Sequence, residues 1–376
     1  MDVSEFLNGQ KMETKKQARY FGNGASATER QLVGRSFAAY AKMEIPPEET
    51  LLGNRWLCRG GGALIVAPSG QGKSVLTAQA SILWACNRSA FGIKPSRPLR
   101  SLILQAEDDD GDMQEMGEII NHLKLTEDEI RMVDTNTFVE PCNDLCSDKL
   151  LVAVDHFLQQ RPSDILWINP YSAYLGADVK NSEANNLLLR TGLNPILKKH
   201  DCAVILIHHT PKTNFNGTEN YKPSDWMYRG SGSADITNWA RAIMVIDPCA
   251  NMGTFKFIAA KRGKRIGWGN EHPVYEEYFS HCKEEGKLLW VPSSEDEIRM
   301  AANSRQGTVA KDLLPFIPDD EDANKEEIYA AINHSGMTVG SKKVKRLLDE
   351  LVAVGLISVV EVPRSGTRAE VKYRRR

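Results

Sequence analysis

The sequence predicts an α/β protein with a central, mostly parallel sheet. Apolar runs of five residues recur between residues 51 and 290, with longer amphipathic segments between them: Ala63–Ala67, Ser101–Gln105, Asp164–Ile168, Ala203–Ile207 and Ala242–Ile246. Continuous apolar runs are typical of parallel strands that helices cover on both faces. A glycine-rich turn joins the first run to a helical segment, Val75–Ala85. Ligands of such sheets bind at the carboxyl ends of the strands.

The composition is that of a soluble globular protein, with 376 residues, 41% of them hydrophobic and 26% charged. A formal net charge of −2 gives no general argument for nucleic-acid binding, so such an argument must rest on local basic patches. No run approaches the roughly 20 apolar residues of a membrane span. The polar N-terminus has no apolar signal core. We therefore expect a cytoplasmic protein without membrane segments.

Changes in composition divide the chain into four parts. Residues 1–47 are polar and basic and end at Pro46-Pro47, which predicts a helical arm and linker. Residues 48–295 hold the predicted α/β domain, and the acidic stretch within 296–324 predicts a linker. Residues 325–376 contain two helical segments and then two strands, an order that predicts a winged helix-turn-helix domain: Lys325–Asn333, Ser341–Val354, Leu356–Val362 and Ala369–Tyr373.

The turn after the first predicted strand has the pattern of a nucleotide-binding P-loop. We expect it to bind the nucleotide through Pro68, Ser69, Gly70, Gln71, Gly72, Lys73, Ser74 and Val75. Its glycines let the backbone wrap around phosphate oxygens, and the start of the helix offers unpaired amides. Lys73 supplies charge to the β- and γ-phosphates, and the Ser74 hydroxyl reaches Mg²⁺. ATP and Mg²⁺ are therefore the expected cofactors, with the small residue Ala67 in place of the usual first glycine.

Polar residues follow three further predicted strands. Glu107 follows the second strand and is the candidate base for the attacking water, although it also fits a solvated acidic loop. Asn169 follows the third strand, where an aspartate is expected. It can orient a water bound to Mg²⁺ but brings no charge. His209 follows the fourth strand and is the candidate sensor of the γ-phosphate.

Together these motifs resemble the RecA-like hexameric helicases, particularly the plasmid RepA type and its mobile-element relatives. The resemblance covers roughly residues 48–290 and rests on the P-loop and on Gln105–Asp108, Asn169–Ala173, His208–Thr210 and Arg229–Ser233. It implies a RecA-like P-loop domain that forms a homo-oligomeric ring, with ATP between subunits. It also implies that a basic residue of the neighbouring subunit completes the site. Arg262 matches best, and the alternative is a basic turn that touches nucleic acid or solvent.

The family also places DNA-binding loops in the central channel of the ring. The matching loops are residues 176–186, with Lys180, and residues 211–233, with Lys212 and Arg229. Glycine, asparagine, aromatic and basic residues of this kind can follow the phosphate backbone of single-stranded DNA. A loop without a ligand is the alternative interpretation.

The C-terminal segment carries its own basic residues. From residue 342 to residue 376, ten Lys or Arg stand against four acids. Four lie at the start of the predicted recognition helix and two in the predicted wing: Lys342, Lys343, Lys345, Arg346, Arg364 and Arg368. This excess favours contacts with the phosphates of duplex DNA, although winged helices also bind proteins.

The sequence therefore predicts an ATP-hydrolysing DNA helicase or translocase, which moves on single-stranded DNA during replication of a plasmid or mobile element. Asn169 favours an alternative, an ATP-gated replication initiator or regulator with little hydrolysis. A small-molecule kinase shares the P-loop, but no acceptor site or lid is recognisable in the sequence.

Overall fold

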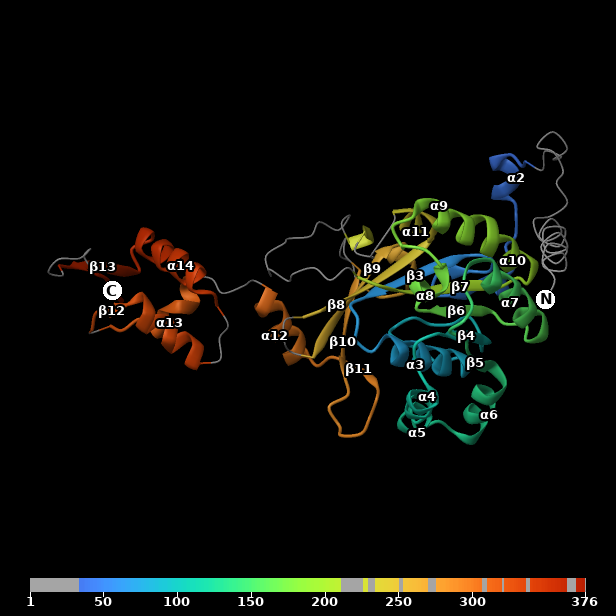
Figure 1. The fold of residues 1–376 in the computed structure, drawn as a ribbon, viewed down its shortest axis with the longest axis horizontal. Helices are drawn as coiled ribbons and strands as arrows, with labels where there is room; N and C mark the ends of the chain where they lie inside the picture. The colour runs from blue at the N-terminus through green and yellow to red at the C-terminus, as the bar shows by residue number, and fades with distance from the viewer. Residues whose placement is uncertain are drawn as a thin grey trace, which may run out of the picture. The chain divides into compact units, whose positions relative to one another are not determined.

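The computed structural model describes residues 34–210, 226–228, 234–249, 253–269, 275–305, 310–319, 321–335, 339–363 and 370–375. They form two compact units that divide between Ser294 and Glu295, and Figure 1 shows the elements of both. No helix in these ranges is both long and apolar enough to span a membrane.

Unit 1 is built on a nine-stranded sheet in the order β11-β10-β9-β8-β3-β7-β6-β4-β5. The six strands from β8 to β5 in this order run parallel, and β9, β10 and β11 extend the sheet with antiparallel pairings. The strands are β3 (Gly62–Ala67), β4 (Ser101–Gln105), β5 (Thr137–Pro141), β6 (Ile165–Asn169), β7 (Ala203–His209), β8 (Ala242–Pro248), β9 (Thr254–Lys261), β10 (Glu276–His281) and β11 (Trp290–Pro292). All five predicted strands are confirmed, whereas β5 and the antiparallel extension were not predicted.

Helices connect the strands on both faces of the sheet. The α-helices of unit 1 are α2 (Phe37–Ala41), α3 (Lys73–Ala85), α4 (Asp110–Gly117), α5 (Ile119–His122), α6 (Glu127–Asn136), α7 (Ser147–Gln160), α8 (Tyr171–Leu175), α9 (Ser182–Asn186), α10 (Asn194–Lys199) and α11 (Ala234–Trp239). The 3-10 helices η2 (Pro47–Glu49), η4 (Trp226–Tyr228) and η5 (Gly263–Arg265), the π-helix η3 (Leu187–Leu193) and the small ribbon of β1 (Thr50–Leu52) and β2 (Leu57–Cys58) complete it.

Alternate residues of the parallel strands face two separate cores. Ile65 and Ile205 pack with α3 on one face, and Val66 and Leu206 pack with α7 and α10 on the other. The two layers of helices lie on either side of the sheet in Figure 1. Burial on both faces explains why these strands are apolar at every position and do not alternate with polar residues.

The order of strands in the sheet differs from their order along the chain. β4 is the next long strand after β3 in sequence, but β7 and β6 lie between them in the sheet. The P-loop strand therefore has β7 and β8 as its neighbours, and the carboxyl ends of β3, β7, β6 and β4 follow one another along one edge. This edge is where a ligand is expected to bind.

Unit 2 is a smaller domain with its own core. Its elements are α12 (Glu295–Arg305), η6 (Ala310–Phe316), β12 (Ala323–Asn324), α13 (Lys325–His334), α14 (Ser341–Ala353), β13 (Ile357–Val362) and β14 (Glu370–Arg375). The strands form an antiparallel sheet in the order β12-β14-β13. Both helices and both strands predicted for this region are confirmed.

Two predicted segments need correction, and a third is described only in part. The acidic linker over 296–324 contains α12 and η6, and Leu313 and Ile317 are buried in the core of unit 2 because η6 packs on α14. Within the predicted loop 176–186, residues from Ser182 onward form α9, which Asn181 caps by accepting a hydrogen bond from the Ala184 amide. The described part of the helical arm holds the short, exposed helix α2, and residues 1–33 lie outside the described residues.

A buried carboxylate anchors the amino ends of the strands. Asp164, which precedes β6, is fully buried and accepts hydrogen bonds from Arg59 at 3.1 Å, from Arg97 at 2.8 and 3.0 Å and from the Arg100 amide at 2.9 Å. Burial alone would raise the pKa of Asp164, but the hydrogen bonds from Arg97 and Arg100 and their charges lower it to about 2.

We predict that Asp164→Asn lowers the free energy of unfolding by about 3 kcal/mol or more at pH 7, because it leaves three arginines around a neutral group. Since the pKa of Asp164 is depressed, its stabilising effect is complete above about pH 4 and disappears as the pH falls towards 2. Urea denaturation from pH 2 to pH 7 measures both effects. Asp128→Asn, which breaks an exposed ion pair with Arg131, is the control and should cost under ~1 kcal/mol. Equal losses in the two variants would contradict the prediction.

Candidate functional site

The P-loop has the backbone that its glycines predict. Gly70 and Gly72 have φ values of 72° and 71°, in the left-handed region that residues with a Cβ rarely adopt. Gly72 is the N-cap of α3 and provides no side chain to cap the helix. The amides of the first turn and the positive end of the helix dipole are therefore available to a phosphate.

Lys73 lies folded back across this loop. Its side chain is largely buried, and its Nζ donates a hydrogen bond to the Pro68 carbonyl at 2.8 Å. Burial lowers the pKa of Lys73 to about 8, and the nearby carboxylate of Glu107 opposes this shift. A phosphate group can take the place of the Pro68 carbonyl as the hydrogen-bond acceptor and restore the charge of the amine.

A chain of hydrogen bonds links the predicted Mg²⁺ ligands to the next two strands. The Asn169 Nδ2 atom donates to Ser74 Oγ at 3.3 Å and to Gln105 Oε1 at 2.7 Å. The amide of Gln105 in turn donates to the carboxylate of Asp108. Ser74 and Asn169 are therefore in contact, but the NH₂ group of Asn169 and not its carbonyl faces Ser74. Binding of Mg²⁺ by this pair stays a prediction, because Mg²⁺ takes oxygen ligands. The carboxylate of Asp108 is two hydrogen bonds away from Asn169, through Gln105. The sequence analysis did not assign a role to Gln105 or Asp108.

The acidic residues that follow β4, 107–110, make different contacts. Asp108 accepts from Gln105, and Asp109 caps α4 by accepting from the amides of Gly111 and Asp112. Glu107 is exposed and has no hydrogen bond or ion pair with another described residue. Its charge acts on Lys73. An exposed carboxylate close to Lys73 fits both interpretations, the base for the attacking water and the solvated acidic loop, so the catalytic role of Glu107 stays a prediction.

His209 lies beside the start of the P-loop, paired in the sheet with Ala67. Its Nδ1 atom is buried and has no hydrogen-bond partner among the described residues. Burial, followed by the charges of Lys73 and His208, lowers the pKa of His209 to about 4, so the imidazole is neutral at pH 7. A neutral imidazole at this position can donate or accept a hydrogen bond without adding charge.

Arg262 lies at the opposite edge of the sheet. It follows β9, whose last residue Lys261 pairs with Ile243, and Ile243 is level with Leu64 near the amino end of β3. Roughly 15 Å of strand therefore separates Arg262 from the P-loop of the same chain. Arg262 donates a hydrogen bond to the Arg55 carbonyl at 3.3 Å. Burial lowers the pKa of Arg262, and nearby Arg265, Arg241 and Arg55 lower it further.

The antiparallel extension also contacts the P-loop, which sequence reasoning missed. Trp290 Nε1 donates to the Gly72 carbonyl at 3.1 Å, and the Trp290 backbone exchanges two hydrogen bonds with the Gln79 side chain at 2.8 and 2.9 Å. The ring of His281 packs on Trp290 with centroids 4.3 Å apart. These residues lie more than 200 positions from the P-loop, and no local sequence signal indicates the contact.

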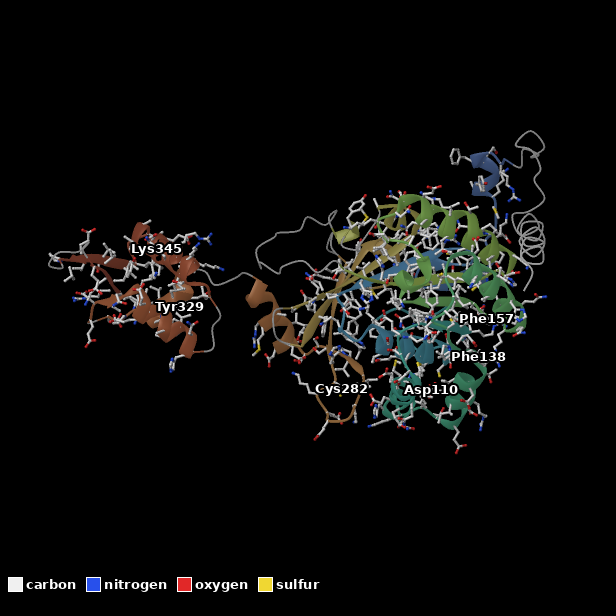
Figure 2. All side chains as sticks on the ribbon, in the orientation of Figure 1. Asp110, Phe138, Phe157, Cys282, Tyr329 and Lys345 are labelled. Atoms are coloured by element: carbon white, nitrogen blue, oxygen red, sulfur yellow. The ribbon has the colours of Figure 1, made fainter. Side chains whose placement is uncertain are left out.

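The predicted DNA-binding residues fall in both units. Lys180 is exposed in a turn before α9, whereas Lys212 and Arg229 lie outside the described residues. On α14 the exposed cations are Lys342, Lys345 and Arg346, while Lys343 is partly buried. Figure 2 labels Lys345 on this helix. The opposite face of α14 is buried in the core of unit 2, and Arg364 and Arg368 lie outside the described residues.

Comparisons with known proteins address the fold and the family. A family profile described as "AAA domain" matches residues 27–214, half of the chain. No curated protein matches. One similar structure is described as an ATPase domain, with 12% identity and a TM-score of 0.43 over 61% of this chain and 85% of that chain. Another is the KaiC-like protein PH0186 from the hyperthermophilic archaeon Pyrococcus horikoshii OT3, with 14% identity and a TM-score of 0.42 over 63% and 91%.

We predict that ATP affinity falls as the pH rises above about 8. Bound phosphates stabilise protonated Lys73, so binding to the free protein, in which its pKa is about 8, requires uptake of a proton above that pH. Affinity should decline by up to about tenfold per pH unit. Fluorescence titration with an ATP analogue between pH 7.5 and 9.5 measures it. Lys73→Arg, which stays charged, should not show the decline, and a decline of equal slope in both proteins would exclude Lys73 as its cause.

We also predict that Asn169→Asp lowers the Mg²⁺ concentration needed for half-maximal ATP hydrolysis by about tenfold, because it places a carboxylate beside the Ser74 hydroxyl. Activity assays over a range of Mg²⁺ concentrations measure the change. Asn143→Asp, at an exposed position, adds the same charge elsewhere and should leave the requirement unchanged. An unchanged requirement in Asn169→Asp would show that this side chain does not face the metal.

Proposed function

The chain belongs to the AAA domain family, and from that premise we propose that this P-loop ATPase is a DNA helicase or translocase that works as a ring on single-stranded DNA. One observation carries the proposal. The P-loop lies at the carboxyl edge of the sheet, whereas Arg262 lies at the amino edge and cannot reach the site of its own chain. A head-to-tail contact between identical chains brings these two edges together, and such contacts form a ring when the rotation between successive chains closes.

In the proposed reaction, water attacks the γ-phosphate of ATP in line with the leaving group. Lys73 and the P-loop amides hold the phosphates, and Ser74 with Asn169 would hold Mg²⁺, which neutralises the charge of the phosphates. Glu107 orients and deprotonates the water. His209 contacts the γ-phosphate from β7, and Arg262 of the next chain stabilises the charge that develops on the transferred group.

DNA contacts are proposed for both units. In unit 1, Lys180 and the segment 211–233 would face the single strand. In unit 2, η6, β12, α13, α14, β13 and β14 follow one another in the order of a winged helix-turn-helix, and we propose that the exposed cations of α14 bind phosphates of duplex DNA. The resemblance to plasmid RepA-type helicases supports a role in replication of a plasmid or mobile element.

A second candidate function is an ATP-gated initiator or regulator that hydrolyses little ATP. The amide network of Ser74, Asn169 and Gln105 favours it, because no carboxylate contacts the Ser74 hydroxyl among the described residues. Such a protein would bind ATP, change its affinity for DNA and release the nucleotide slowly.

We predict that purified protein hydrolyses ATP and that single-stranded DNA raises the rate at least tenfold, because the proposed DNA contacts follow β6 and β7 in the chain, the strands that end at Asn169 and His209. A coupled assay with and without an oligonucleotide measures the rate. Lys73→Ala is the control and should abolish hydrolysis in both conditions. If ATP binds but turnover stays at the level of Lys73→Ala, the motor is excluded and the ATP-gated binding protein is supported.

A further inference from the structure

A basic pocket lies at the amino edge of the sheet, the edge away from the P-loop. It has a volume of about 430 Å³, and its lining includes Arg59, Arg190, Asn194, Lys198, Trp239 and Arg241. The lining also includes Gly62, the first residue of β3, while Arg241 directly precedes β8. Four of the lining residues are cations and none is acidic. The pocket is therefore a concave site of positive potential.

One wall of the pocket is a single helical face. Arg190 in η3 and Asn194 and Lys198 in α10 are spaced four residues apart, so they share one side of a continuous helical segment. All three are exposed. The Arg190 Nε atom donates to Asn186 Oδ1 at 3.0 Å, which holds the side chain and leaves its two terminal nitrogens for a ligand.

The opposite wall is formed by the ends of strands. A Cβ atom on Gly62 would lie 2.3 Å from the Trp239 ring, so glycine is needed for the indole to pack there. Trp239 Nε1 donates to Asn194 Oδ1 at 3.0 Å, which leaves the amide NH₂ of Asn194 as a donor. The backbone amides of Gly60 and Arg241 are already paired with carbonyls. These two amides are therefore not free for a ligand, and the side chains of the pocket supply the donors on which recognition depends.

The positive charge of the pocket is only partly neutralised. Arg59 is paired with Asp164 at 3.1 Å and with Asp201 at 3.3 Å. Arg190, Lys198 and Arg241 have no ion pair with any residue in the described part of the chain. Three cations held around one cavity without acids repel one another, and a bound anion relieves that repulsion.

The positive charge of the pocket also lowers the pKa values of cations beside it. Burial lowers the pKa of Lys261, and the charges of Arg262 and Arg190 lower it further. Arg241 contributes in the same direction to the lowered pKa of Arg262. The pocket and the end of β9 thus belong to one basic region.

We infer that this pocket binds a phosphate group with two or more negative charges, such as the terminal phosphates of a nucleotide or of a phosphorylated small molecule. Two exposed guanidinium groups match the oxygens of a phosphate in pairs, and a lysine adds a point charge. The volume lies in the range of small-molecule sites. The phosphate has two possible sources, a nucleotide held by a second copy of this chain or a free metabolite. Neither source requires DNA motor activity.

The test uses the full chain with Lys73→Ala, which weakens the P-loop, and inorganic pyrophosphate as the probe. Isothermal titration calorimetry at low ionic strength should show one saturable site. Arg190→Ala/Arg241→Ala in the same background should weaken binding at least tenfold. Lys94→Ala/Lys149→Ala removes the same charge from exposed positions outside the pocket and should leave the affinity unchanged. Thermal unfolding of each variant checks that it is folded.

Three results would overturn the inference. They are no saturable binding to Lys73→Ala, equal binding with and without the two arginines, and equal weakening in the two double variants. A nucleic-acid surface is a fourth outcome that would refute it: the pocket variant loses affinity for a single-stranded oligonucleotide while pyrophosphate fails to compete. Pyrophosphate binding needs no ATP hydrolysis. The pocket can therefore fail to bind pyrophosphate while the proposed function holds, and the proposed function can fail while the pocket binds pyrophosphate.

A mixing experiment identifies the source of the phosphate. Arg190→Ala/Arg241→Ala keeps its own P-loop, and Lys73→Ala keeps the pocket. If each alone hydrolyses ATP poorly but their mixture recovers activity, the pocket acts on the nucleotide of a second copy. If Arg190→Ala/Arg241→Ala hydrolyses ATP at the wild-type rate and still loses pyrophosphate binding, the ligand is a free phosphorylated molecule.

Discussion

Burial of the central strands on both faces is the constraint on which unit 1 depends. A strand covered by helices on both sides can place polar side chains only at its ends, because a buried polar group without a partner is costly. Gln105, Asn169 and His209 are therefore the last residues of β4, β6 and β7. The parallel register then sets them side by side, with Gln105 opposite Asn169 and His209 opposite Ala67. The site is a consequence of how the sheet is buried.

The antiparallel extension reaches both edges of the sheet. β9 returns the chain to the amino edge and places Lys261 and Arg262 beside the basic pocket. β10 and β11 then bring Trp290 back to α3 and to the Gly72 carbonyl. The extension of β9, β10 and β11 therefore contacts the P-loop at one edge of the sheet and places Lys261 and Arg262 at the other edge.

Ser74, Asn169 and Gln105 form the corner where we propose that Mg²⁺ binds, and Asn169 stands where an aspartate is expected. An aspartate at the end of β6 would put a full charge next to the metal, whereas Asn169 uses its amide to bond Ser74 and Gln105. The charge then lies on Asp108 and reaches the corner through Gln105. A relayed charge holds Mg²⁺ less strongly than a direct one, because Coulomb attraction falls with distance and with each intervening polar group.

The sequence by itself determined the five parallel strands, the P-loop with its two left-handed glycines, and the helices and hairpin of unit 2. These features are local, since a buried strand, a glycine turn and an amphipathic helix each have a pattern within a few residues. The tertiary structure alone decided the order of strands, the hydrogen bonds of Gln105 and Asp108, the contact of Trp290 with Gly72, and the pocket of Arg59, Arg190, Lys198 and Arg241. These depend on contacts between residues far apart in the chain. In the sequence, a single arginine or tryptophan cannot be told from an ordinary surface or core residue, because its neighbours in space are known only from the fold.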